Sequence, residues 1–395
     1  MSQANYLTNL TKRSSMKKIV LLFLCIAVLL SAKVGGVNVT IFAHNQISTT
    51  AKASVVIEAS TKRVLFEKEK DMQLPMASTT KIMTALVALE NTQDLDEVFD
   101  VDNRAVGIEG TSIYLKKDEH LSMRDLLLGL MLASGNDASL AIAYKVGNGN
   151  LQSFVDMMNK KASDLSLSNT HFDNPHGLDS KTHYTSAYDL ACITACAMQN
   201  KDFREIVSTK FAQIPDSKQG KYRFLKNKHR LLQNGFDGCE GVKTGFTDNA
   251  RRCCVTSVLR NNMRLICVVL NCQDMFEDSK KQIDWCFEKY KMYKLLEPNK
   301  YVDSIQVENG KSESVKTYTR QEFAYPLSEN EASKINSKYV IERCIEAPVE
   351  KNQEVGIYKI YFDNNLIFET KVYTIDSVDT KDYTEKLKDI VDNWY

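Results

Sequence analysis

The most informative stretch of this chain is Met76-Ala77-Ser78-Thr79-Thr80-Lys81-Ile82-Met83-Thr84, at the start of an apolar run. On a helix, residues three positions apart share one face, with Cβ atoms roughly 5–6 Å apart. An unprotonated Lys81 amine would therefore reach the Ser78 hydroxyl and take its proton, as in an activated serine nucleophile. The same spacing occurs twice more near the N-terminus, at Ser14/Lys17 and Ser15/Lys18. The pair therefore needs support from other motifs.

Two further motifs follow in order. Ser134-Gly135-Asn136 lies in a loop expected between two helices, and Lys243-Thr244-Gly245 lies where a strand is expected. A second Ser-x-Asn, Ser328/Asn330, falls after Lys243, whereas the Lys-Thr-Gly triplet occurs once. In this order the three motifs match the set found in penicillin-binding proteins and class A β-lactamases, with Gly135 in place of aspartate.

Length and composition set broad limits on the protein. A chain of 395 residues suggests two or three domains, and 43% apolar with 26% charged residues is ordinary for globular proteins. The formal net charge of +1 offers no basic footprint for phosphates. We therefore expect no nucleic-acid partner.

The N-terminal residues, 1–45, form a leader that we interpret as a signal peptide. Met16-Lys17-Lys18 precedes an apolar region at 19–30, which is followed by Ser31-Ala32-Lys33. A basic segment before a short apolar one is typical of secretory signals. Cleavage near Ala32 is plausible, Met1 and Met16 are both candidate starts, and an uncut segment would serve as an anchor. The protein is expected outside the cytoplasm, in the cell wall or on the outer face of the cytoplasmic membrane.

The ten cysteines include Cys25 in the leader, which leaves nine in the rest of the chain. An odd number cannot all pair within one chain, so structural thiols are expected, with one disulfide possible. Cys192 and Cys196 are spaced so that they could share a metal. No cysteine pair has the two-residue spacing of a zinc finger, however, and the six histidines are scattered. We expect neither a metal nor a cofactor.

Residue patterns divide the remainder into residues 46–298, which mix helices and strands, residues 299–375, which form short strands, and a tail at 376–395. In the first part, strands are expected at Ala53–Glu58, Val64–Lys68, from Cys239, at Cys253–Arg260 and at Met263–Leu270, the last two joined by Asn261-Asn262. Helices are expected after Ser78, at Ser122–Ala133, Ala138–Val146 and 151–165, from Thr185-Ser186, and at Met275–Leu296.

The C-terminal parts carry no nucleophile with a base. Five strands are expected there, at Tyr301–Val307, Val315–Thr319, Tyr339–Ile345, Gly356–Phe362 and Leu366–Tyr373. The tail has an apolar stripe of Leu387, Ile390, Val391 and Trp394, which fits contact with a membrane surface. Six acidic residues against three lysines oppose binding to anionic lipid, so packing on the protein remains an equal alternative.

In these motifs the chain resembles the serine-type D-alanyl-D-alanine carboxypeptidases, which are low-molecular-mass penicillin-binding proteins. The resemblance covers about Lys52 to Tyr373 and includes the loop Asn174-Pro175-His176-Gly177-Leu178. Glu240 stands where the family has Asp, and Arg251 stands where Gly is usual. The resemblance implies an α+β fold. A β-lactamase/DD-peptidase-like catalytic domain, with an antiparallel sheet flanked by helices and an all-α part, would precede a small all-β domain.

The catalytic residues expected are Ser78, Lys81 and Ser134. Ser78 would attack the carbonyl of the penultimate D-Ala of a peptidoglycan stem peptide, and water would then hydrolyse the acyl-enzyme. Lys81 must be neutral to act as the base, and a nearby Lys243 cation would lower its pKa. Ser134 would pass a proton to the leaving amine. The same serine would be acylated by β-lactam inhibitors.

The substrate-binding residues expected are Asn136, Lys243, Thr244, Gly245 and Phe246. Asn136 would hold the substrate amide and fix Lys81, while Lys243 and Thr244 suit the terminal carboxylate. Gly245 would let the strand approach the substrate closely. By resemblance, the backbone N–H groups of Ser78 and Phe246 form the oxyanion hole.

Other functions fit the residues less well. A class A β-lactamase would need a glutamate for deacylation, and residues 163–179 contain none. A non-catalytic wall-binding or β-lactam-binding protein would not need Ser78, Lys81 and Lys243 together. An endopeptidase acting on peptide cross-links would use the same chemistry and stays open.

Other polar and aromatic residues are interpreted as structural. His176 and His183 are expected to be structural, because no Gly-x-Ser-x-Gly elbow is present. Ser186 and Asp189 are expected to cap a helix. Tyr and Trp side chains are interpreted as core rather than as a sugar platform, although some could line the groove.

Overall fold

The computed structural model describes residues 47–216 and 220–392. The predicted signal segment at 19–30 lies outside these described residues. Within them, no helix is both long enough and apolar enough to span a membrane.

The first part of the chain, which mixes helices and strands, is built on a five-stranded antiparallel sheet. In spatial order its strands are β2 (Val64–Lys68), β1 (Ala53–Glu58), β9 (Met263–Leu270), β8 (Arg251–Arg260) and β7 (Cys239–Thr247). The five predicted strands are therefore confirmed. Asn261 and Asn262 connect β8 to β9 with φ angles of 48° and 61°, the positive values that a two-residue hairpin requires.

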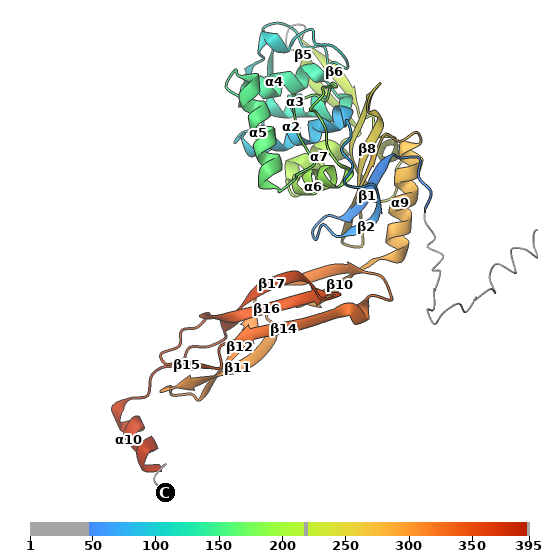
Figure 1. Ribbon diagram of the computed structural model, residues 1–395. Helices are drawn as coiled ribbons and strands as arrows, with labels where there is room; N and C mark the ends of the chain where they lie inside the picture. Colours follow the sequence, from blue (N-terminus) through green and yellow to red (C-terminus); the bar gives the residue numbers. More distant parts are fainter. Residues whose placement is uncertain (1–46, 217–219, 393–395) are drawn as a thin grey trace, which may run out of the picture. The chain divides into compact units, whose positions relative to one another are not determined.

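Both faces of the central strands are covered, which explains their long apolar runs. Successive side chains of a strand point to opposite faces. In β9, Ile266 and Val268 join the core on the helical side, whereas Cys267 and Val269 join a second core beneath α9 (Met275–Lys289). Figure 1 shows α9 on one face of the sheet and the helices labelled α2 to α7 (residues 81–208) on the opposite face.

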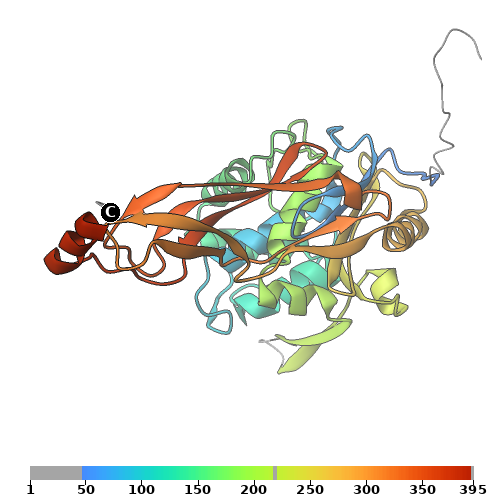
Figure 2. The same cartoon turned by 90° about the horizontal axis from the view of Figure 1, so that it is seen from below.

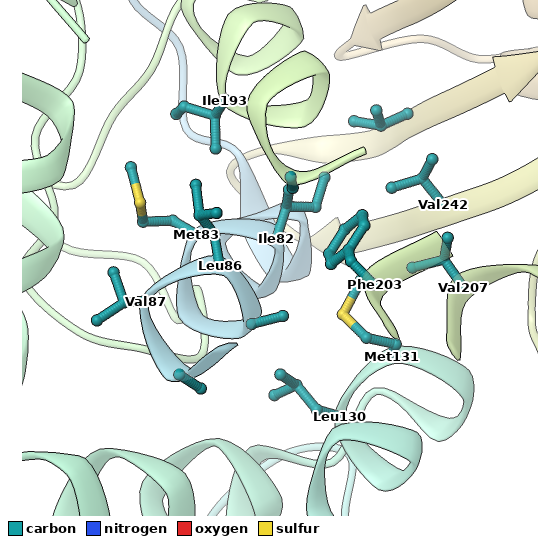
Figure 3. Packing of buried hydrophobic residues seen from close by; sticks show 14 of the residues in the cluster. Ile82, Met83, Leu86, Val87, Leu130, Met131, Ile193, Phe203, Val207 and Val242 are labelled. Carbon is teal, nitrogen blue, oxygen red and sulfur yellow. The ribbon is translucent and has the colours of Figure 1, made fainter. Parts of the chain in front are cut away.

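Helix α2 (Lys81–Glu90) lies at the centre of the helical part. Its first nine residues are all buried, so the helix is enclosed on all sides rather than along one stripe. The helices around it are α4 (Asn136–Val146), α5 (Leu151–Asp164), α6 (Ala187–Ala197) and α7 (Lys201–Ser208). Figure 3 shows Ile82 and Leu86 of α2 among side chains that include Ile193 of α6 and Phe203 of α7.

Local capping agrees with the sequence at two helix starts. Ser122 forms a capping box with Asp125 at α3 (Met123–Leu128), and Ser186 caps α6 by accepting a hydrogen bond from the Asp189 N–H. The predicted helix to Ala133 continues past α3, but its last turn, Gly129–Ala133, is a π-helix.

The expected helix over Met275–Leu296 is wrong in its C-terminal third. Helix α9 ends at Lys289, and Tyr290 is extended with φ −118° and ψ 143°. The chain then forms β10 (Lys291–Leu296), which pairs with β13 (Phe323–Leu327), a strand that was not predicted. Pairing with a distant strand satisfies this short segment's backbone groups, so tertiary contacts override its helical pattern.

The C-terminal part contains a six-stranded sheet, in which the spatial order of the strands is β14-β16-β17-β12-β11-β15. The strands are β11 (Tyr301–Glu308), β12 (Ser314–Thr319), β14 (Ile335–Ile341), β15 (Cys344–Glu346), β16 (Glu354–Phe362) and β17 (Asn365–Thr374) (Figure 2). The single strand expected at Tyr339–Ile345 is wrong, because the chain breaks after Ile341. Its two halves, β14 and β15, lie at opposite edges of the sheet.

Several short elements were not predicted. These are β3 (Val98–Asp100), β4 (His120–Ser122), the hairpin of β5 (Phe211–Asp216) and β6 (Lys221–Lys226), α7 and α8 (Arg230–Gln233). Most are too short to show a periodic pattern.

The tail contains helix α10 (Tyr383–Asp392), on which Leu387 and Val391 are exposed. Trp394 of the predicted stripe lies outside the described residues. The nine cysteines between Cys192 and Cys344 are all free thiols, so the possible disulfide does not form. Burial raises the pKa of Cys253 and Cys254 to about 12, which agrees with structural thiols.

Candidate active site

Ser78 and Lys81 meet at the junction between a 3₁₀ turn (Ala77–Thr80) and α2. In a 3₁₀ turn, residues three apart eclipse one another, so the two side chains align more closely than on an α-helix. The Lys81 Nζ lies 2.9 Å from the Ser78 Oγ. Ala77, just before the serine, has a φ of 49°, a left-handed conformation that is uncommon outside glycine.

The Lys81 side chain is 0% exposed and is held by two further oxygens. Its Nζ donates to the Asn136 Oδ1 at 2.8 Å and to the backbone carbonyl of His176 at 2.6 Å. A neutral amine has two N–H bonds and one lone pair. With the two N–H groups directed at these oxygens, the lone pair is left for the Ser78 hydroxyl.

The pKa of Lys81 is lowered well below its ordinary value of 10.5. Burial is the largest cause, because it removes the ammonium from water, and the positive charges of Lys243 and Lys228 follow. The negative charge of Asp137 acts in the opposite direction. The arrangement therefore favours the neutral amine that a general base requires.

The second motif, Ser134-Gly135-Asn136, borders the site on the side of the helices. Ser134 ends the π-helical turn in a left-handed conformation with φ 68°, and Asn136 begins α4. The Asn136 Nδ2 donates to the Glu109 carbonyl at 2.7 Å, which fixes the amide that also accepts from Lys81. The buried carboxylate of Asp137 accepts from the Ile113 N–H and thus holds the loop before it.

The Asn-Pro-His-Gly loop supports the site through its backbone. The Pro175 carbonyl accepts from the Thr84 and Ser139 hydroxyls, both at 2.6 Å, and the next carbonyl accepts from Lys81. Gly177 has a φ of 92° and packs against the backbone of Ala77. The loop is thus a support for Ser78 and Lys81.

The two histidines near the site remain neutral. Burial is the main cause that lowers the pKa of His176 to about 3 and that of His183 to about 4. The His183 Nδ1 accepts from the Asp173 N–H, so its Nε2 carries the proton and donates to the Thr80 hydroxyl at 2.8 Å. Neither ring is hydrogen-bonded to Ser78, in agreement with the structural role expected.

Strand β7 brings the third motif to the serine from the sheet side. A Cβ atom at Gly245 would lie 2.9 Å from the Ser78 backbone nitrogen, so only glycine permits this approach. Lys243 is 2% exposed and its Nζ donates to the Thr244 carbonyl at 2.8 Å. Burial, followed by the charge of Lys228, lowers the pKa of Lys243 to about 7.

The two departures from the family pattern are accommodated locally. The Glu240 carboxylate forms a bidentate ion pair with Arg264, at 2.8 and 2.9 Å. Arg251 has a φ of 56°, a conformation that glycine adopts without strain, which explains why glycine is usual there.

These segments enclose a cleft of about 410 Å³. Its lining residues are Ser78, Thr111, Ser134, Lys228, Thr244, Gly245, Phe246, Arg252 and Met275. Five of the eight predicted site residues are among them, whereas Lys81, Asn136 and Lys243 lie buried behind the lining. Among residues 47–216 and 220–392, no cluster of three or more metal-ligating side chains occurs.

The cations among the lining residues are Lys228 and Arg252, and neither was predicted from the sequence. Arg252 lies opposite Phe246 in the pairing of β7 with β8. The sequence predicted that this strand begins at Cys253. Had the prediction begun at Arg251, it would have placed Arg252 beside the predicted site residue Phe246. Lys228 follows β6 in a segment without a periodic pattern. Nothing in the sequence marks its position.

Gly177→Ala is expected to destabilise the protein, because a Cβ there would lie 1.9 Å from the Ala77 carbonyl oxygen. Backbone strain and overpacking together should cost about 3 kcal/mol. The matched control is Gly107→Ala, where φ is 76° and nothing lies within 4 Å. Thermal unfolding should show a clearly larger loss for Gly177→Ala, and equal losses would contradict the packing described.

Comparisons with known proteins agree with this geometry. Residues 40–274 match the family model of D-alanyl-D-alanine carboxypeptidases, and residues 290–380 match the model of the penicillin-binding protein 5 C-terminal domain. The D-alanyl-D-alanine carboxypeptidase DacF of Bacillus subtilis is 30% identical over 358 residues, which cover 89% of this chain and 91% of the relative.

Solved structures give the same result. Penicillin-binding protein 5 of Haemophilus influenzae matches with a TM-score of 0.71 at 27% identity, over 85% of this chain and 99% of that one. A mutant of the Streptomyces K15 DD-transpeptidase matches with a TM-score of 0.58 at 32% identity, over 62% of this chain and 100% of that one. The protein described here therefore belongs to the D-alanyl-D-alanine carboxypeptidase family, and its C-terminal domain is of the penicillin-binding protein 5 type.

Proposed function

We propose that this enzyme is a penicillin-sensitive carboxypeptidase that removes the terminal D-Ala from peptidoglycan pentapeptide stems through an acyl-Ser78 intermediate. The observation that carries the proposal is the buried Lys81 amine, 2.9 Å from the Ser78 hydroxyl and hydrogen-bonded to two carbonyl oxygens. This arrangement supplies a neutral base that is already aligned with its nucleophile.

In the first step, Lys81 accepts the hydroxyl proton while the Ser78 oxygen attacks the carbonyl carbon of the penultimate D-Ala. A tetrahedral oxyanion forms, and the backbone N–H groups of Ser78 and Phe246 are the proposed donors that stabilise it. The carbon–nitrogen bond then breaks. Ser134, which lines the cleft, relays the proton held by Lys81 to the departing amine, and free D-Ala leaves.

The substrate peptide is proposed to extend along the outer edge of β7. This strand is the last in its sheet, so one side of its backbone is open for pairing with an extended peptide. Asn136 would contact the substrate amide. Thr244 would donate its hydroxyl to the terminal carboxylate, with Lys243 supplying charge from behind and Arg252 supplying it from the cleft lining.

In the second step, water hydrolyses the acyl-enzyme. Residues 163–179, where a class A β-lactamase would carry its deacylating base, contain no glutamate. In this chain the loop instead holds Lys81 and Thr84 through carbonyl oxygens. The β-lactamase alternative is therefore disfavoured. An endopeptidase would use the same acyl-enzyme chemistry and is separated from a carboxypeptidase by its substrate alone.

Ser78→Ala is expected to abolish the covalent penicillin adduct and to lower D-Ala release from a pentapeptide by several orders of magnitude. Mass spectrometry of the intact protein measures the adduct, and quantification of free D-Ala measures the turnover. Ser328→Ala, in the second Ser-x-Asn, is the matched control and should behave as wild type. An adduct that survives in Ser78→Ala would refute the assignment, and rapid penicillin turnover without D-Ala release would favour a β-lactamase.

The acylation rate should rise with pH through the pKa of Lys81, because only the neutral amine accepts the proton. Lys243→Gln removes a positive charge that lowers this pKa. The pKa of Lys81 should therefore rise, and the rising limb of the profile should move to higher pH. The effect should be largest below about pH 7, where Lys243 is protonated.

The measurement is the second-order rate of acylation by a fluorescent penicillin as a function of pH. Lys226→Gln, which removes an exposed lysine outside the cleft lining, is the control and should leave the limb in place. If Lys243→Gln lowered the acylation rate at every pH without moving the rising limb to higher pH, the charge of Lys243 would not be what lowers the pKa of Lys81.

We further propose that the protein is exported through its N-terminal segment and contacts the membrane surface through its tail. The basic and apolar segments before Ala32 support export, and the exposed Leu387 and Val391 on α10 support membrane contact. In a bacterial host, the full chain should appear outside the cytoplasm with a new N-terminus near Ala32. Deleting residues 376–395 should release it from membranes. Retention of the full chain in the cytoplasm would contradict export. Membrane association that persists after the deletion would contradict membrane contact through the tail.

A further inference from the structure

The hairpin of β5 and β6 projects from the helical part of the catalytic domain (Figure 2). Residues directly opposite in an antiparallel pair point to the same face. One face of the hairpin therefore carries the three pairs Phe211/Lys226, Gln213/Phe224 and Pro215/Tyr222. We refer to these six residues as the outer hairpin face.

The aromatic rings of the outer hairpin face are strongly exposed. Phe211 is 64% exposed, Tyr222 61% and Phe224 77%. Large aromatic side chains normally bury most of their area, and a cluster of exposed rings marks an interaction surface. A shallow hollow of about 460 Å³ lies against two of these rings and is lined by Phe211, Ala212, Gln213, Phe224, Leu225 and Lys226.

The opposite face of the hairpin is anchored firmly. Ile214 and Leu225 belong to the main core, and Arg223 forms a bidentate ion pair with the buried Glu119 at 2.6 and 2.9 Å. Lys116 binds the Asp216 carboxylate at 2.6 Å. The outer rings are therefore held by a rigid support, which keeps the ordering cost of binding low.

The outer hairpin face lies close to the catalytic cleft along the chain, because Lys226 of this face is two residues before Lys228 of the cleft lining. β6 is followed by the buried Asn227 and then by Lys228, which lines the cleft and whose N–H donates to the Leu132 carbonyl. Arg223 also donates to the carbonyl of Tyr114, an 80% exposed residue three positions after the cleft residue Thr111. A substrate too large for the cleft could therefore extend from Lys228 toward this surface.

We propose that the outer hairpin face binds the sugar backbone of the peptidoglycan whose stem peptide occupies the cleft. The inference rests on the proposed function, because the peptide in the cleft must then be attached to a glycan strand. The C–H face of a sugar ring packs against an aromatic ring, and Gln213 and Lys226 can hydrogen-bond to hydroxyl and acetamido oxygens. No Leu, Ile, Val or Met lies on this described face, so its apolar surface is mainly that of aromatic rings.

The test compares two substrates in the full-length protein: a free pentapeptide and the same pentapeptide linked to a soluble oligosaccharide of wall glycan. Binding energy from a remote part of a substrate raises kcat/KM for the substrate that carries this part. In Phe211→Ala/Phe224→Ala, the ratio of kcat/KM for the glycan-linked over the free peptide should fall about tenfold, or about 1.4 kcal/mol.

Tyr301→Ala, which removes a 51% exposed ring from β11, is the matched control and should leave the ratio unchanged. Thermal unfolding should show that the double variant remains folded. An unchanged ratio in the double variant would overturn the proposal. So would wild-type binding to phosphatidylglycerol vesicles that is lost in the double variant, because a membrane would then be the partner.

A binding measurement that does not depend on catalysis separates this proposal from the proposed function. Saturation-transfer NMR with a peptide-free oligosaccharide of β-1,4-linked N-acetylhexosamines should show contact with wild type and only background with the double variant. Equal signals from both proteins would overturn the proposal. Failure of wild type to release D-Ala from the free pentapeptide would instead refute the proposed function and leave the sugar contact to be judged by NMR.

Discussion

The Lys81 amine is enclosed by the protein, and the oxygens that it contacts, from Ser78, Asn136 and His176, are all uncharged. An ammonium removed from water without a carboxylate partner becomes neutral, because burial penalises its charged form. The three oxygens belong to a 3₁₀ turn, to the start of α4 and to the loop before α6. The helical core packs around α2. This packing holds the turn, the start of α4 and the loop within hydrogen-bonding distance of the Lys81 amine.

The same constraint accounts for strained backbone beside the motif residues. Ala77 and Ser134 adopt left-handed conformations that cost roughly 1 kcal/mol or more in residues with a Cβ. Strain of this kind persists only where the surrounding structure determines it. Gly177 packs against Ala77, and the Asp137 carboxylate holds the loop beside Ser134. Packing of the supporting loops therefore stabilises an arrangement that the local chain would not adopt alone.

Regular elements were largely predictable from the sequence, whereas elements that depend on a distant partner were not. The strands β1 and β9 match their predicted limits because both carry apolar runs bounded by turn residues. By contrast, β10 pairs with the distant strand β13, and β14 and β15 join opposite edges of one sheet. The β5–β6 hairpin was missed as well. Its Phe side chains are exposed, so the hairpin lacks the alternation of buried apolar and exposed polar residues by which a strand is recognised in a sequence.

The sequence by itself determined which chemical groups the protein has and in what order: the Ser78–Lys81 spacing, Ser134-Gly135-Asn136 and Lys243-Thr244-Gly245. These are properties of residue type and local spacing. Only the tertiary structure decided that Lys81 is buried and neutral, that the His176 carbonyl holds it, and that Lys228 and Arg252 line the cleft. Burial and electrostatic environment arise from segments far apart in the chain, and no local pattern encodes how these segments meet.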